Sequence, residues 1–372
     1  MGADMKMILR WFPFGDDSVT LKQIRQTPGI SGVATCLPRA PAGEVWPLET
    51  VKALKAEIEE AGLEMEVIES VNVHEDIKKG LPTRDKYIAA YIKTLQNLAY
   101  VGVKCLCYNF MPVIDWARSD LAHTLPDGSY AMVYRHEEVL KMNPASMAAA
   151  MSDESRGYSL PGWEPERLAA MAGDIRFYRN LSRGAYWGNM KYFLDAVIPE
   201  AERFGIVLAI HPDDPPWPLY GLPKLITCAE HIRTFLALNG SRHNGLTLCA
   251  GSLGADPDND IPAIAREFSG MGRVHFAHLR NLRRLSARDF DETAHPSACG
   301  DLDMFEILKA LYDTGFNGYI RPDHGRMIWG EKARPGYGLY DRALGANYLL
   351  GLWEAIKKMD KMDKINKMDK MS

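Results

Sequence analysis

Residues 206–211 read IVLAIH, a short apolar run that ends in a histidine, and runs of this kind indicate the fold class. The chain holds eight of them, each about as long as a buried strand. The predicted strands are 6–11 (KMILRW), 30–36 (ISGVATC), 65–70 (MEVIES), 103–109 (VKCLCYN), 206–211 (IVLAIH), 246–250 (LTLCA), 273–279 (RVHFAHL) and 317–322 (NGYIRP). The helices predicted between them are 18–26, 48–61, 84–100, 189–204, 223–238, 262–268 and 304–314.

Regular alternation of strand and helix predicts a parallel sheet. Eight such units predict that the sheet closes into a (β/α)₈ barrel, the TIM barrel of the α/β class. The length of 372 residues suits one barrel with an insertion, since such barrels run from about 200 to over 400 residues. We therefore predict a single barrel domain over residues 1–358.

Two segments depart from this pattern. Residues 111–188 follow the fourth predicted strand and are far longer than a barrel loop requires. This insertion leaves the carboxyl-terminal face, where barrel active sites lie, so it is either a lid, an oligomer contact or a surface elaboration. Residues 359–372 repeat a Lys-Met-Asp unit, and we predict a low-complexity tail that extends the last helix for a turn or two and then frays.

Composition excludes several classes of partner. The net charge of −4 argues against nucleic acid, because nucleic-acid binders usually carry a basic face. Six cysteines in a chain of this length are not a disulfide framework, and no apolar stretch is long enough for a signal peptide or a membrane span. We expect a cytoplasmic protein that binds a small molecule. The insertion and the apolar last helix (NYLLGLWEAI) predict a homo-oligomer.

Four consecutive predicted strands end in side chains that bind metals: His211 (IHPDDPP), Cys249 (LCAGSLG), His278 (FAHLRN) and Asp323 (RPDHGR). They are 38, 29 and 45 residues apart, each about one strand–helix unit, so barrel closure would gather them on one face. A lone buried cysteine is usually a small hydrophobe, but four such side chains together predict a metal site. Two imidazoles, a thiolate and a carboxylate suit Zn²⁺, Fe²⁺ or Co²⁺ better than Mg²⁺, and softness alone does not favour Mn²⁺.

The residues after the eighth strand indicate acid–base chemistry. His324 directly follows Asp323, and in an extended strand neighbouring side chains point to opposite faces, so His324 is free to handle protons. Tyr337 lies between two glycines in RPGYGLYDRALG, which predicts a tight loop that presents a phenol at the barrel mouth. Tyr340 is the competing candidate.

Positive and polar side chains near the same strand ends predict the binding of an anion. Arginine recognises carboxylates through paired hydrogen bonds. The substrate-binding candidates are Arg280, Asn109, Arg326, Arg10 and Trp11, with Arg321 as a further positive charge nearby. His295 is either a second-sphere residue or a surface residue.

These motifs together resemble the D-mannonate dehydratase family of the xylose-isomerase-like barrel group. The resemblance runs over most of the chain, but the KMDK tail has no counterpart in it. It is carried by MKMILRWF, YNFMPVIDWARSDL, AIHPDDPP, LCAGSLG, HFAHLRN, GDLDM, RPDHGR and PGYGLYDRALGANYLLGLWEA.

The resemblance implies a lyase that eliminates water from D-mannonate to give 2-dehydro-3-deoxy-D-gluconate in glucuronate catabolism, with one Mn²⁺ or Fe²⁺ per chain. The metal ligands of the family fall on the same four residues, and its catalytic residues fall on His324 and Tyr337. The family's use of Mn²⁺ runs against the softness argument, and Zn²⁺ stays as an inhibitory occupant.

Three alternatives remain open at this point. One is a dehydratase of another aldonic acid. A second is a metal-dependent sugar isomerase or epimerase on the same barrel, whose sites favour Glu and Asp ligands. The third is a non-catalytic sensor of sugar acids.

Overall fold

Eight parallel strands close into a barrel in the order β1-β12-β9-β8-β7-β4-β3-β2. The computed structural model describes residues 5–38, 40–142, 158 and 165–371. The barrel strands are β1 (Lys6–Arg10), β2 (Ile30–Thr35), β3 (Glu64–Glu69), β4 (Cys105–Tyr108), β7 (Val207–Ile210), β8 (Asn244–Cys249), β9 (Val274–His278) and β12 (Tyr319–Arg321). The (β/α)₈ barrel predicted from the sequence is therefore confirmed.

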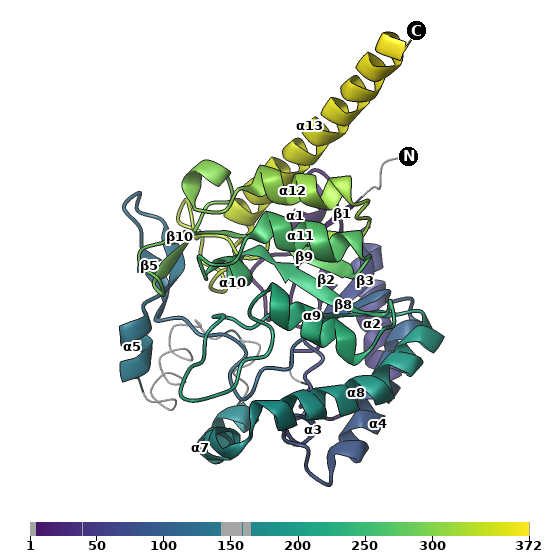
Figure 1. The fold of residues 1–372 in the computed structure, drawn as a ribbon, viewed down its shortest axis with the longest axis vertical. Helices are drawn as coiled ribbons and strands as arrows, with labels where there is room; N and C mark the ends of the chain where they lie inside the picture. Colours follow the sequence, from purple (N-terminus) through teal and green to yellow (C-terminus); the bar gives the residue numbers. More distant parts are fainter. Residues whose placement is uncertain (1–4, 39, 143–157, 159–164, 372) are drawn as a thin grey trace.

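Helices follow the strands and cover the outside of the barrel (Figure 1). They are α1 (Leu21–Gln26), α2 (Leu48–Glu60), α4 (Arg84–Tyr100), α8 (Arg183–Phe204), α9 (Ala229–Leu238), α11 (Ile261–Gly270), α12 (Met304–Asp313) and α13 (Leu339–Met371). Shorter elements are α3 (Glu75–Lys79), α5 (His136–Lys141), α10 (Ala250–Gly254) and the 3₁₀ helix Ser297–Cys299. Within the described ranges, none of the helices has both the length and the apolar character needed to cross a membrane.

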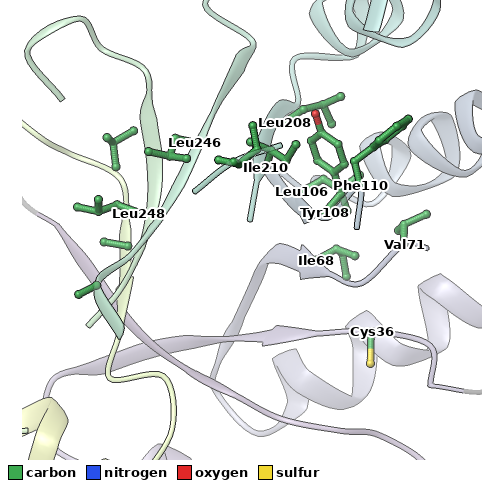
Figure 2. Close-up of a cluster of buried hydrophobic side chains, with 14 of the residues drawn as sticks. Cys36, Ile68, Val71, Leu106, Tyr108, Phe110, Leu208, Ile210, Leu246 and Leu248 are labelled. Carbon is green, nitrogen blue, oxygen red and sulfur yellow. The ribbon is translucent and has the colours of Figure 1, made fainter. Parts of the chain in front are cut away.

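The barrel strands bury side chains on both faces, so the barrel has two cores. Outward side chains such as Leu106, Leu208 and Leu246 belong to the large core that the helices complete (Figure 2). The inner core contains Ile8, Ala34, Val67, Cys105, Cys107, Ala209 and Phe276. Since side chains in a strand alternate with a period of two, the next inward positions toward the carboxyl ends are 10, 69, 211 and 278. The polar residues at these positions therefore form the top layer of the barrel interior.

A second sheet, which the sequence analysis did not predict, stands beside the barrel. It is antiparallel, with the order β10-β11-β6-β5. Its strands β5 (Asp120–Thr124) and β6 (Tyr130–Tyr134) come from the insertion after β4, whereas β10 (Asn281–Arg284) and β11 (Phe290–Thr293) come from the loop after β9. Pairing of Phe290 with Tyr134 and of Asp291 with Val133 joins the two segments. We call it the auxiliary sheet.

The rest of the predicted insertion contains α5, α7 (Pro165–Asn180) and the start of α8. Residues 143–157 and 159–164 of this segment lie outside the described part of the chain. Its role as a lid or an oligomer contact therefore stays a prediction.

The last helix, α13, differs from the prediction because it continues through the Lys-Met-Asp repeat to Met371 and projects away from the barrel (Figure 1). Tyr312 donates to Asp360, and Lys364 pairs with Asp360 four residues earlier. Pairs with this spacing each add about 0.2–0.5 kcal/mol to a helix. The apolar face of the helix, with Leu349 and Trp353, is buried against this chain's own barrel. Burial of this face within the chain removes one reason for predicting a homo-oligomer. The homo-oligomer stays a prediction.

Candidate active site

A cavity opens at the carboxyl ends of the barrel strands. Its polar wall includes Arg10, Glu69, Asn109, His211, Arg321, Asp323, His324 and Tyr337. The insertion contributes Met111, Asp115, Trp116 and Met132 to the lining. The cavity is thus built from strand ends, from the insertion and from the loop after β12.

The four predicted metal ligands meet beside this cavity. One ligand atom each of His211, Cys249 and His278 lies within 4.8 Å of the other two. The Cys249 sulfur is 3.7 Å from Oδ2 of Asp323, and Nδ1 of His278 is 3.8 Å from Oδ1 of the same carboxylate. Three of the four side chains thus form one tight group with Asp323 beside it, and this set of ligand types suits a single divalent ion.

The ring nitrogens and the negative charge of this group also suit the binding of a cation. Nδ1 of His211 donates to the carbonyl of Pro212 at 2.7 Å, which leaves Nε2 free as a ligand. Burial lowers the pKa of His211, but the neighbouring Cys249, Asp323 and Glu69 outweigh burial and raise that pKa to about 9. Nδ1 of His278 lies toward Asp323, whereas Nε2 of the same ring is 3.9 Å from Glu69. The site is therefore rich in negative charge and has an imidazole nitrogen of each histidine near its carboxylate or thiol.

Asp323 is held in place by two arginines. Arg321 Nη2 lies 2.7 Å from Oδ1, and Arg280 Nε donates to Oδ2 at 3.0 Å. Burial raises the pKa of Asp323, but Arg321, His324, His278 and Arg280 outweigh burial and keep it well below the usual range. The backbone of Asp323 has φ of 62°, a left-handed conformation that Asp tolerates better than most residues. The carboxylate is thus ionised and oriented before any ligand binds.

A second group with ligand atoms within 4.8 Å of one another comprises Glu69, Cys107 and His278. Burial raises the pKa of Cys107 well above its usual range, which disfavours the thiolate form that binds metals. Thr247 also donates to its sulfur, and Arg321 donates to Glu69 at 3.0 Å. This group is consequently a poorer metal site than the first.

The two predicted acid–base residues lie side by side. The rings of His324 and Tyr337 are 5.1 Å apart at an interplanar angle of 75°, and both residues line the cavity. Burial raises the pKa of Tyr337 to about 12. Tyr340, the competing tyrosine, is 42% exposed and packs against Trp329 instead. The geometry favours Tyr337, although its catalytic role stays a prediction.

Two of the five predicted substrate-binding residues, Arg10 and Asn109, line the cavity. Trp11 is buried and donates to the carbonyl of Val19. Arg326 pairs with Asp341 and Asp127. Proximity in sequence to a strand end did not determine where these two side chains point.

Arg280, the fifth substrate-binding candidate, is surrounded by carboxylates. Its guanidinium is buried among Asp214, Glu292 and Asp323, with distances of 2.9, 3.1 and 3.0 Å. It is not among the lining residues. Its ion pairs hold these carboxylates in place, and its contact with a substrate stays a prediction.

Sequence reasoning missed Glu69 and Glu292. Glu69 lies two positions after the inward residue Val67, just as His211 lies two positions after the inward residue Ala209. The period of two in a strand could therefore have predicted that Glu69 points into the barrel. Glu292 lies in β11 of the auxiliary sheet and accepts from His324, with Nδ1–Oε2 and Nδ1–Oε1 distances of 3.0 and 3.2 Å. Burial raises the pKa of Glu292, but His324, Arg280 and Arg118 outweigh burial and lower it to about 2.

His295 proves to be buried, and its Nε2 donates to the carbonyl of Pro322 at 2.6 Å, next to Asp323. Gly345 of α13 faces this imidazole so closely that a Cβ atom would overlap it.

We expect Gly345→Ala to lower the free energy of unfolding by about 1–3 kcal/mol, the usual cost of overpacking. Gly351, exposed on the same helix with nothing near its Cβ position, is the matched control. Gly351→Ala should raise the free energy of unfolding by about 0.5–1 kcal/mol. Denaturant unfolding of both variants measures this, and a stabilised Gly345→Ala protein would contradict the packing described.

Comparison with known proteins identifies the family. Residues 5–363 match the family model D-mannonate dehydratase (UxuA). The mannonate dehydratase of Thermotoga neapolitana is 56% identical over 355 residues, which are 95% of this chain and 99% of that protein. The crystal structure of mannonate dehydratase from Streptococcus suis serotype 2 superposes with a TM-score of 0.87 at 44% identity, over 96% of both chains. L-ribulose 3-epimerase, at 11% identity and a TM-score of 0.54 over 96% of this chain and 98% of that one, shares the fold alone. The chain belongs to the D-mannonate dehydratase family.

Proposed function

We propose that this protein dehydrates D-mannonate to 2-dehydro-3-deoxy-D-gluconate, as a cytoplasmic enzyme of glucuronate catabolism. Membership of the family supports a hydro-lyase. The observation that carries the proposal is the convergence of His211, Cys249, His278 and Asp323 beside the pair formed by His324 and Tyr337. A metal site with an adjacent acid–base pair suits elimination of water from a sugar acid.

The substrate is an anion, and two arginines that already pair with Glu69 line the cavity with N–H groups to spare. Arg10 and Arg321 both line it, and each has Nε and Nη1 buried without a hydrogen-bond partner. Unsatisfied buried donors are costly, so these N–H groups are suited to bind a carboxylate or the hydroxyls beside it. Asn109 adds an amide at the same wall.

The four ligands would hold one Mn²⁺ or Fe²⁺. A divalent ion bound there would stabilise the negative charge that develops on the substrate carboxylate as the C2 proton leaves. The protein contributes the ionised carboxylate of Asp323, and the arginines beside it keep that carboxylate in position.

His324 and Tyr337 divide the two proton transfers. His324 removes the proton from C2, a weakly acidic position next to the carboxylate. Tyr337 donates a proton to the departing C3 hydroxyl, because a phenol whose pKa is raised to about 12 is protonated at neutral pH. The enol that results then tautomerises to the 2-keto acid.

The test is turnover of D-mannonate by protein stripped with a chelator and then supplied separately with Mn²⁺, Fe²⁺, Zn²⁺ or Mg²⁺. We expect 2-keto acid with Mn²⁺ or Fe²⁺, and little with Zn²⁺. D-gluconate and an aldose serve as parallel substrates. Conversion of gluconate alone, isomerisation of the aldose, or no product with any metal would contradict the proposal.

A further inference from the structure

We propose that Glu292 is a positioning residue that orients His324 for proton transfer, and that the auxiliary sheet supplies it. This inference rests on the proposed function for the identity of the reaction. Both carboxylate oxygens of Glu292 lie within 3.2 Å of Nδ1 of His324. The two residues come from different parts of the fold, β11 and the segment after β12.

Glu292 is itself held by two arginines. Arg118 donates to Oε1 through Nε at 3.0 Å and Nη2 at 2.7 Å, and Arg280 Nη1 donates to the same oxygen at 3.1 Å. Arg118 also pairs with both oxygens of Asp214, at 2.9 and 3.0 Å. All four residues are buried. Two charged donors thus leave the carboxylate of Glu292 little freedom to rotate away from His324.

The contact determines which ring nitrogen of His324 is available. A neutral imidazole has one N–H and one acceptor nitrogen, and the bond made by one nitrogen decides the state of the other. With Nδ1–H donating to Glu292, Nε2 carries the lone pair. His324 lines the cavity, so Nε2 becomes the base.

The auxiliary sheet joins the two segments that hold this contact. Arg118 precedes β5 in the insertion, and Glu292 lies in β11, which pairs with β6. The neighbouring carboxylate on the same strand, Asp291, pairs with Arg135 at 2.6 Å and does not contact His324. Asp291 is therefore a matched control for removal of a carboxylate from β11.

The experiment is a double-mutant cycle with Glu292→Gln and His324→Asn, with Asp291→Asn as control. We expect Glu292→Gln to lower kcat by about 10- to 100-fold, the cost of losing a hydrogen bond to a charged group, with KM and bound metal nearly unchanged. In the His324→Asn background, Glu292→Gln should change kcat by no more than about twofold, because the two residues act as one unit. Asp291→Asn should keep kcat.

If Glu292→Gln lowered kcat equally in the wild-type and His324→Asn proteins, Glu292 would only stabilise the fold, and the proposal would be overturned. An unchanged kcat in Glu292→Gln would overturn it as well.

A second measurement needs neither a Glu292 variant nor a substrate. ¹⁵N histidine spectra of the zinc-loaded protein, recorded where the ring is neutral and assigned with His324→Asn, report the tautomer directly. We expect the proton on Nδ1 of His324, and a proton on Nε2 would overturn the proposal. If the wild-type protein did not dehydrate D-mannonate, the proposed function would be wrong, but the tautomer of His324 could still be determined from these spectra.

Discussion

Cys249→Ser is expected to remove bound metal and turnover together. The sulfur lies 3.7 Å from Asp323 and belongs to the group formed with His211 and His278. A serine hydroxyl does not ionise at neutral pH and is a poor replacement for a thiolate. Since even an outer-sphere change costs about 10–100-fold in metal affinity or activity, loss of a direct ligand should cost more than roughly 100-fold. Metal content after dialysis, together with turnover of D-mannonate, measures the effect.

The control for this experiment is Cys299→Ser. Cys299 is a free, partly exposed cysteine in the loop after β9, and it is remote in sequence from all four proposed ligands. Its replacement should leave metal content and turnover unchanged. A Cys249→Ser protein that retains a full equivalent of tightly bound metal would contradict the assignment of the sulfur as a ligand.

His324→Asn has the second large effect, and it should separate chemistry from metal binding. Asparagine approximates the size of the ring but cannot accept a proton at the pH of the reaction. Removal of a general acid–base residue typically costs about 10²–10⁴-fold in rate. We expect that loss in kcat while one equivalent of metal stays bound, because the four proposed ligands are intact.

His123→Asn is the matched control, since His123 is a partly exposed residue that pairs with Asp120 in β5. Metal analysis and kcat are measured for both variants. Near-normal turnover by His324→Asn would refute its role in proton transfer. Loss of metal from His324→Asn would show instead that the residue is needed to build the metal site.

The sequence was sufficient to predict the barrel and the group of proposed ligands, for a physical reason. Strand–helix repeats determine barrel closure, and the period of two determines which side chain at a strand end points inward. His211 and His278 follow the inward residues Ala209 and Phe276 by two positions. Their convergence is therefore a property of local sequence together with a regular fold.

The remainder of the site depends on contacts that local sequence does not encode. Glu292 reaches His324 only because β11 pairs with β6 from the insertion, an antiparallel pairing between segments over 150 residues apart in sequence. Arg280 and Arg326 were expected to bind substrate because they lie near strand ends, but ion pairs with buried carboxylates determine where they point. The distance of a residue from a strand end in the sequence predicts where its backbone lies, but it does not predict where its side chain points.

The most direct test of the account is anomalous diffraction at the manganese edge from crystals of the Mn²⁺-loaded protein. We predict one anomalous peak per chain, within bonding distance, about 2.0–2.4 Å, of His211, Cys249, His278 and Asp323. A peak bonded to Glu69 and Cys107 instead, or one with the Cys249 sulfur beyond bonding distance, would contradict it.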